Sequence, residues 1–82
     1  MMAATSREAL LAVFTRRGRR RYAEAAILLR AWDFEDRLSR RGHVVWVHSR
    51  GVTLTIPERR ELTAFYQSLV VKMIKQLQLL DG

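Results

Sequence analysis

A histidine preceded by two arginines is the combination in this sequence best suited to chemistry. His43 directly follows Arg40, Arg41 and Gly42. An imidazole transfers protons near neutral pH because its unperturbed pKa is about 6.5, and a guanidinium holds phosphate through paired hydrogen bonds. Metal-free RNA cleavage needs a base for the 2′-hydroxyl proton, cations for the phosphate and an acid for the leaving oxygen. A site of this kind would use His43 as the general base or acid and Arg40 and Arg41 on the phosphate, with no second proton carrier visible; the alternative is that the His43 ring is packed into a small core.

Positive charge is the main feature of the composition. The chain has 15 basic and 8 acidic residues, which gives a formal net charge of +7. Its arginines form clusters at residues 16–21, 40–41 and 59–60. Such a field attracts polyanions, so nucleic acid is the expected partner class. Arg59 and Arg60 are predicted to assist at the phosphate. Arg19, Arg20 and Arg21 suit two roles, an electrostatic arm on RNA or a docking surface for an acidic protein.

Length and residue content exclude several other classes of protein. A chain of 82 residues predicts one domain with a small core. It contains no cysteine, so neither a disulfide framework nor a cysteine-ligated zinc site is possible. Two histidines and few carboxylates predict no metal site, and no cofactor is expected. The apolar runs are shorter than the ~20 residues of a spanning helix, and the start of the chain does not resemble a signal peptide. We therefore expect a cytoplasmic protein that does not contact a membrane.

Hydrophobic spacing predicts helices at both ends of the chain. Residues 5–18 predict a first helix, which Thr5 and Glu8 would begin with a capping box. Residues 19–32 predict a second helix. Gly18 either separates the two helices or only distorts one continuous helix. A longer helix is predicted within residues 58–80. Its expected apolar stripe comprises Leu62, Phe65, Tyr66, Leu69, Met73, Leu77 and Leu80.

The middle of the chain predicts three strands. Residues 34–40 are interpreted as a charged edge strand, residues 43–49 as a strand rich in β-branched residues, and residues 51–57 as a strand that Pro57 ends. Together with the helices, this order predicts an α+β fold. Its three-stranded antiparallel sheet carries helices on one face, and an extra helix precedes it.

The turn between the last two strands decides which way His43 faces. A type I turn with Gly51 in the left-handed position sets His48 opposite Val52. Trp46 then faces the helices as a core residue, and His43 faces the open side of the sheet. A two-residue turn would reverse these faces and make Trp46 a candidate for base stacking. In either register the two histidines, five residues apart, face opposite sides. Only one of them can act on a substrate, and His48 is interpreted as structural.

The order of these elements resembles the HicA family of toxin–antitoxin systems. The matching segments are "LLRAWDF", "RLSRRGHVVWVH", "VTLTIP" and "SLVVKMIKQL", within Ile27 to Leu79. HicA proteins are small basic endoribonucleases with a double-stranded-RNA-binding-domain-like fold, and the histidine after their glycine-containing turn is catalytic, which matches His43. The resemblance implies a HicA-like core at 21–82, a helical extension at 1–20, and an mRNA-cleaving toxin that needs no metal. It also implies a HicB-like antitoxin partner.

The sequence departs from the family at two sites, and its first thirty residues are longer than the family's usual N-terminus. Arg40-Arg41-Gly42-His43 stands where the family usually has glycine, serine, any residue and histidine, and Arg59 stands where many members have a second histidine. Two other functions therefore stay open. One is a non-catalytic RNA-binding module, in which His43 is a half-buried residue hydrogen-bonded to the backbone. The other is a DNA-binding regulator, although the basic clusters lie at the ends of elements and not along one helix.

Overall fold

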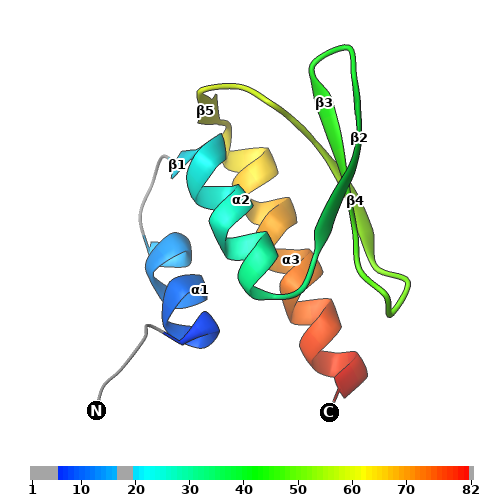
Figure 1. Ribbon diagram of the computed structural model, residues 1–82. Coiled ribbons are helices and arrows are strands. Elements are labelled where there is room, and N and C mark those ends of the chain that lie inside the picture. The colour runs from blue at the N-terminus through cyan, green and yellow to red at the C-terminus, as the bar shows by residue number, and fades with distance from the viewer. Residues whose placement is uncertain (1–5, 17–19, 82) are drawn as a thin grey trace.

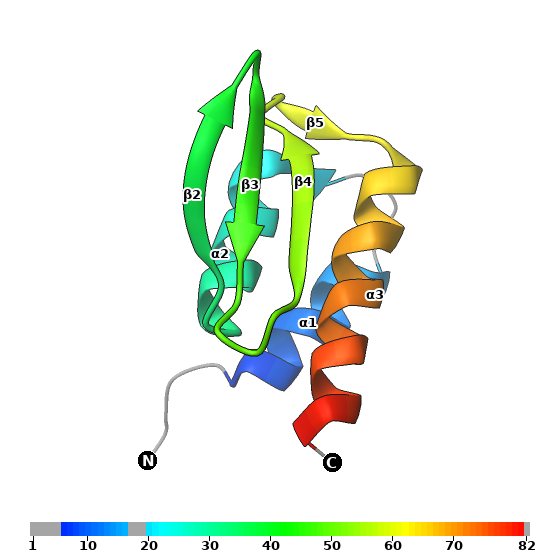
Figure 2. The same cartoon turned by 90° about the vertical axis from the view of Figure 1, so that its right-hand side faces the viewer.

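The computed structural model describes residues 6–16 and 20–81, without the side chains of residues 20, 38–40 and 81. The elements in order are α1 (Arg7–Arg16), β1 (Arg20–Arg21), α2 (Tyr22–Ala31), β2 (Glu35–Arg40), β3 (His43–Val47), β4 (Thr53–Pro57), β5 (Glu61–Leu62) and α3 (Ala64–Asp81). They form three layers: the β2-β3-β4 sheet, the pair α2 and α3 on one of its faces, and α1 on the far side of that pair (Figures 1 and 2). The predicted α+β layout is confirmed.

The N-terminal helix begins one residue later than its predicted cap implies. The hydroxyl of Ser6 accepts a hydrogen bond from the backbone N–H of Ala9 at 3.1 Å, which is the geometry of an N-cap residue and its N3 partner. Glu8 is therefore not at N3 and cannot close a capping box with this cap. Thr5, the predicted cap, lies outside the described residues.

The second helix is shorter than predicted at its start. Arg20 and Arg21 form β1, which pairs antiparallel with β5 in the register Arg20 with Leu62 and Arg21 with Glu61. Helix α2 begins only at Tyr22. The two predicted helices are thus separate, and the chain between them contributes a short strand. Gly18 itself lies outside the described residues.

The three-stranded sheet has the register that places His43 on the open side. Trp46 pairs with Leu54, and the N–H of His48 donates to the carbonyl of Val52 at 2.9 Å. Gly51 has a φ of +90°, as the predicted turn requires. All three predicted strands are present, β2 lies at an edge, and β4 ends at Pro57. The preferred register is therefore confirmed.

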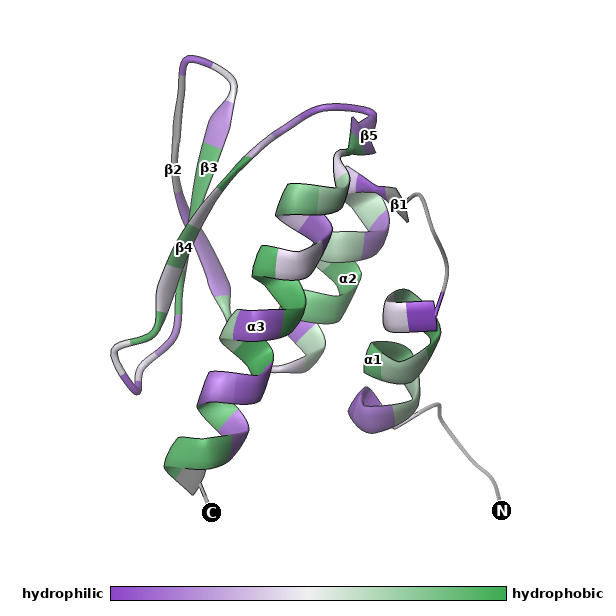
Figure 3. Cartoon of the chain, turned by 180° about the vertical axis from the view of Figure 1, so that it is seen from behind, coloured by the Kyte–Doolittle hydropathy of each residue, from purple (hydrophilic) through white to green (hydrophobic). Residues whose placement is uncertain are grey.

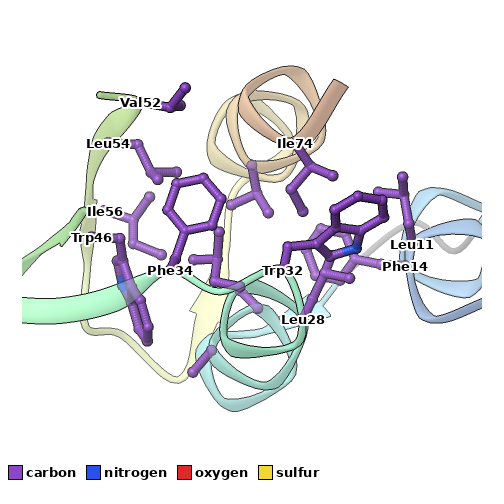
Figure 4. Packing of buried hydrophobic residues seen from close by; sticks show 14 of the residues in the cluster. Leu11, Phe14, Leu28, Trp32, Phe34, Trp46, Val52, Leu54, Ile56 and Ile74 are labelled. Carbon is purple, nitrogen blue, oxygen red and sulfur yellow. The ribbon is translucent and has the colours of Figure 1, made fainter. Parts of the chain in front are cut away.

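The core lies between the sheet and the helices and extends to α1. Figure 4 shows Trp46, Leu54 and Ile56 of the sheet facing Phe34 and Ile74, with Phe14 of α1 beyond them in the same cluster. The buried apolar residues are Leu11, Phe14, Ala25, Ala26, Leu28, Leu29, Trp32, Phe34, Val44, Trp46, Val52, Leu54, Ile56, Leu62, Val70, Ile74 and Leu77. The predicted core role of Trp46 is confirmed, since its side chain is fully buried.

The apolar stripe of α3 was predicted wrongly in part. Phe65 and Leu80 are 69% and 48% exposed, whereas Val70 and Ile74, which the predicted stripe omitted, are fully buried. Apolar residues occur on several sides of this helix, so periodicity does not select one face. The sheet and α2 select it, because the side pressed against them excludes water.

Helix α1 is held to the rest of the fold through Trp32. The indole N–H of Trp32 donates to the carbonyl of Arg7 at 3.1 Å, and the Arg7 guanidinium lies 4.3 Å from the ring centroid. Leu11 and Phe14 add buried contacts from the same helix. The extra helix is therefore packed into the common core, and truncating it would expose Trp32.

Candidate functional site

His43 opens β3 immediately after a tight turn. Arg40, the last residue of β2, pairs with His43, so Arg41 and Gly42 alone form the connection. Both have positive φ angles, +54° and +78°, which is the signature of a type I′ hairpin turn. The His43 side chain is half-buried, and its register with Pro57 places it on the helix-free face of the sheet.

The backbone of the turn orients the His43 ring. Nδ1 lies 3.2 Å from the carbonyl oxygen of Arg41. A carbonyl oxygen only accepts, so Nδ1 is the donor in this pair and the neutral ring carries its free lone pair on Nε2. The ring has both the backbone hydrogen bond of a structural histidine and the proton-accepting nitrogen of a general base.

Backbone hydrogen bonds join three arginine segments that are distant in the sequence. The N–H of Glu58 donates to the carbonyl of Gly42 at 2.6 Å, which ties residues 58–60 to the Arg41–Gly42 turn. The N–H of Tyr22 donates to the carbonyl of Arg60 at 3.2 Å, next to the β1–β5 pair. Both views place these segments at one end of the molecule (Figures 1 and 2). We call residues 20–21, 40–43 and 59–60 the arginine-rich end.

Several arginines of this end are available to an anion. Arg21, Arg41, Arg59 and Arg60 are exposed. Elsewhere, Arg7, Arg30 and Arg37 lie within 4 Å of carboxylates. Within the part of the chain that the structure describes, no carboxylate forms an ion pair with Arg41, Arg59 or Arg60. Their guanidinium groups are therefore not neutralised by a neighbouring acid.

The remaining predicted site residues are described only in part. Arg19 lies outside the described residues. The backbones of Arg20 and Arg40 end up in β1 and β2, but their side chains are not described. The backbone N–H of Arg21 donates to the Glu24 carboxylate at 3.0 Å, which leaves its guanidinium out of that contact.

The second histidine has a structural environment. His48 is only 8% exposed and faces the helices. Its Nδ1 accepts a hydrogen bond from the backbone N–H of Arg50 at 3.0 Å, and its ring lies edge-on to Phe34 at 5.2 Å. It therefore closes the β3–β4 turn on the face opposite His43 and is not within reach of the same substrate.

A tyrosine next to the arginine-rich end was missed by the sequence analysis. Tyr22 is half-buried beside Trp46, with ring centroids 6.5 Å apart. Burial raises its pKa above the ordinary value, the carboxylates of Glu58 and Asp36 add to the rise, and Trp46 opposes it. The pairing of β1 with β5 and the hydrogen bond from Tyr22 to Arg60 bring Tyr22 to this end of the molecule, and no local motif signals either contact.

The described residues were also compared with the requirements of a metal site and of a membrane-spanning helix. Among the described residues, no three histidine, aspartate or glutamate side chains come together as a metal-binding group. In residues 6–16 and 20–81, no helix has the length and hydrophobicity needed to cross a membrane. Comparison of the chain with family models, curated proteins and solved structures found no match.

Proposed function

We propose that this chain is a metal-independent endoribonuclease that holds RNA at the arginine-rich end and uses His43 to move a proton. One observation carries the proposal: backbone hydrogen bonds link three arginine segments, and one of these segments ends at the half-buried His43 on the helix-free face of the sheet. The exposed guanidinium groups of Arg41, Arg59 and Arg60 supply phosphate ligands. The Arg41 carbonyl holds His43 as the tautomer whose Nε2 accepts protons.

The reaction that fits these groups is internal transesterification. Nε2 of His43 takes the proton of a 2′-hydroxyl, and the 2′-oxygen forms a bond to the adjacent phosphorus. Guanidinium groups stabilise the extra negative charge on the phosphate oxygens. The bond to the 5′-oxygen then breaks, that oxygen takes a proton from water, and the hydroxide left behind takes the proton from His43, which restores the base. The products carry a 2′,3′-cyclic phosphate and a 5′-hydroxyl, so the substrate must be RNA.

The resemblance to HicA proteins gives this activity a setting. The substrate is mRNA, and the chain is the toxin of a toxin–antitoxin pair. A HicB-like antitoxin, with acidic side chains, inhibits it by covering the arginine-rich end, because groups that bind phosphate also bind carboxylates. Cleavage that lacks a second positioned proton carrier is slow, which suits a protein that stops growth.

A non-catalytic RNA-binding module is the second candidate. The observation that favours it is the position of His48, which is buried on the opposite face of the sheet. The chain has two histidines, so only one imidazole can face RNA. In this case His43 would stabilise the turn through its hydrogen bond to the Arg41 carbonyl, and the arginines would bind RNA without cleaving it.

The test is cleavage of a long RNA by the purified chain, with and without EDTA. We expect cleavage to survive chelation and to fall about 10²–10⁴-fold in His43→Ala, while the matched His48→Asn variant keeps the rate. Circular dichroism establishes that both variants fold. Undiminished cleavage by folded His43→Ala would end the catalytic assignment. RNA binding without cleavage by the unaltered chain would establish the second candidate, and preference for duplex DNA would favour a regulator.

A further inference from the structure

A second surface lies on the side of the helices away from the sheet. A groove of about 740 Å³ runs between α1 and α3. Phe14, Val71 and Leu79 give it apolar walls, and Lys72, Lys75 and Gln76 line it with polar groups. Leu79 is 82% exposed, so a large apolar side chain of the groove faces solvent. Figure 3 shows α3 between the sheet and α1, with hydrophobic and hydrophilic residues alternating along α3.

The charge of the groove has one sign. The chain has only two lysines, Lys72 and Lys75, and both line the groove. No aspartate or glutamate is among the lining residues. Helix α3 has no acidic residue before Asp81. A ligand that fills this groove therefore meets apolar side chains and two ammonium groups, with no carboxylate opposing it.

The shape indicates how long an occupant would be. The lining residues of α3 run from Gln67 to Leu79, a rise of about 18 Å at 1.5 Å per residue. This length matches about three turns of a helix lying alongside α3. Helices that bind in such grooves anchor through apolar side chains spaced at i, i+3 or i+4, and i+7.

We propose that the groove between α1 and α3 docks an amphipathic helix of a partner protein, with apolar anchors on one side and acidic side chains flanking them. Apolar anchors would cover Leu79, Val71 and the edge of Phe14, and carboxylates would reach Lys72 and Lys75. A second copy of this chain is the less suitable occupant. Two copies would set like-charged lysines against each other, and each carries a formal charge of +7.

This docking site is separate from the arginine-rich end and does not rest on RNA binding. The groove residues belong to α1 and α3, while the exposed arginines of that end belong to β1, to the β2–β3 turn and to the connection between β4 and β5. Ligands of the two surfaces therefore differ in chemistry. The groove combines apolar walls with two ammonium groups, whereas the arginine-rich end presents guanidinium groups.

The test is an NMR titration of the isotope-labelled full chain with three synthetic peptides of about three helical turns. One peptide has a leucine stripe flanked by glutamates, one has the same composition in scrambled order, and one has lysines in place of the glutamates. We expect the first to bind, to shift the amide signals of Phe14, Val71 and Leu79, and to weaken as salt is added. The scrambled and basic peptides are expected to bind at least about tenfold more weakly.

Matched variants separate the role of charge from the role of the fold. Lys72→Glu combined with Lys75→Glu is expected to weaken binding by about tenfold or more. Lys72→Arg combined with Lys75→Arg keeps the charge and is expected to retain binding. Both lysines are exposed, so both double variants should fold, and Leu79→Ser tests the apolar anchor independently.

Several outcomes would overturn the proposal. The absence of binding at millimolar acidic peptide, or equal binding of the scrambled or basic peptide, would show that the groove does not select this chemistry. Shifts confined to the arginine-rich end would place the peptide elsewhere. A concentration-dependent dimer whose signals map to the groove would make a second copy the occupant.

Discussion

The two-residue turn of the β2–β3 hairpin places Arg41 in a left-handed backbone conformation, which is unfavourable for arginine. Arg41 has a φ of +54° and precedes Gly42 at +78°. Type I′ turns prefer asparagine followed by glycine, because both central residues must be left-handed. The substitution Arg41→Asn would supply this preferred pair and would remove one guanidinium from the arginine-rich end. Stability and RNA binding should therefore change in opposite directions.

The structure sets the size of both effects. A left-handed conformation costs an ordinary residue about 1–2 kcal/mol, and asparagine is one of the few exceptions. Arg41 is exposed and has no ion pair among the described residues, so its replacement removes little that stabilises the fold. We expect a gain of about 1 kcal/mol, which for a domain of this size raises Tm by about 4–8 °C.

The expected loss in RNA binding follows from one missing phosphate contact. A hydrogen bond to a charged group contributes about 1.5 kcal/mol or more, which corresponds to about tenfold in Kd. The slope of log K against log salt should fall by about 0.7 for a single-stranded RNA. If RNA occupied another surface, neither quantity would change.

The assay is thermal unfolding combined with a binding titration against salt on the same preparations. Lys75→Gln is the matched control, since it removes one positive charge outside the arginine-rich end and should keep both the RNA affinity and the slope. A lower Tm for Arg41→Asn would refute the inference of strain at Arg41. An unchanged affinity, or an equal loss in Lys75→Gln, would refute the placement of RNA at the arginine-rich end.

Three further predictions concern buried polar groups. Trp32→Phe should destabilise the fold by about 1–3 kcal/mol in denaturant titrations, because the indole N–H that donates to the Arg7 carbonyl is lost; an unchanged free energy of unfolding would contradict this. His48→Leu should lower the free energy of unfolding by about 1 kcal/mol and His48→Asn by less, because only asparagine can still accept from the Arg50 N–H. Because burial raises the pKa of Tyr22 in the folded state, the neutral phenol contributes its full stabilisation to the fold below about pH 10. This contribution is lost as pH rises through the folded-state pKa. Denaturant midpoints across the alkaline range should fall less in Tyr22→Phe.

The hairpin that carries His43 could be predicted from the sequence because its determinants are local. Ser49-Arg50-Gly51 is a turn in which only glycine readily adopts the required positive φ. Once that turn is fixed, the alternation of β3 and β4 assigns every side chain to a face. The faces of His43, Trp46 and His48 followed from this one decision, and the structure agrees with all three.

The remaining features depend on contacts between distant segments. The β1–β5 pair is two residues long and is held by backbone hydrogen bonds, so it has no hydrophobic pattern to detect. Helix α3 is apolar on several sides, and only its packing against α2 and the sheet selects Val70 and Ile74. The link between the Arg41–Gly42 turn and residues 58–60 is a backbone hydrogen bond from Glu58 to Gly42. Local sequence reasoning contains none of this information.

The arginine-rich end and the groove carry different basic residues, and this difference bears on whether the two surfaces bind their ligands independently. Arginine binds phosphate bidentately, whereas lysine acts as a point charge on a flexible stem. The chain has both of its lysines at the groove and several uncommitted arginines at the other surface. If each surface has its own partner, the effects of Arg59→Gln and Lys72→Glu on the free energy of RNA binding should add in the double variant, with Lys72→Glu contributing almost nothing, since sites without shared contacts do not couple. A coupling well above about 0.5 kcal/mol would mean that both ligands compete for one electrostatic field, and the molecule would then have a single polyanion-binding surface.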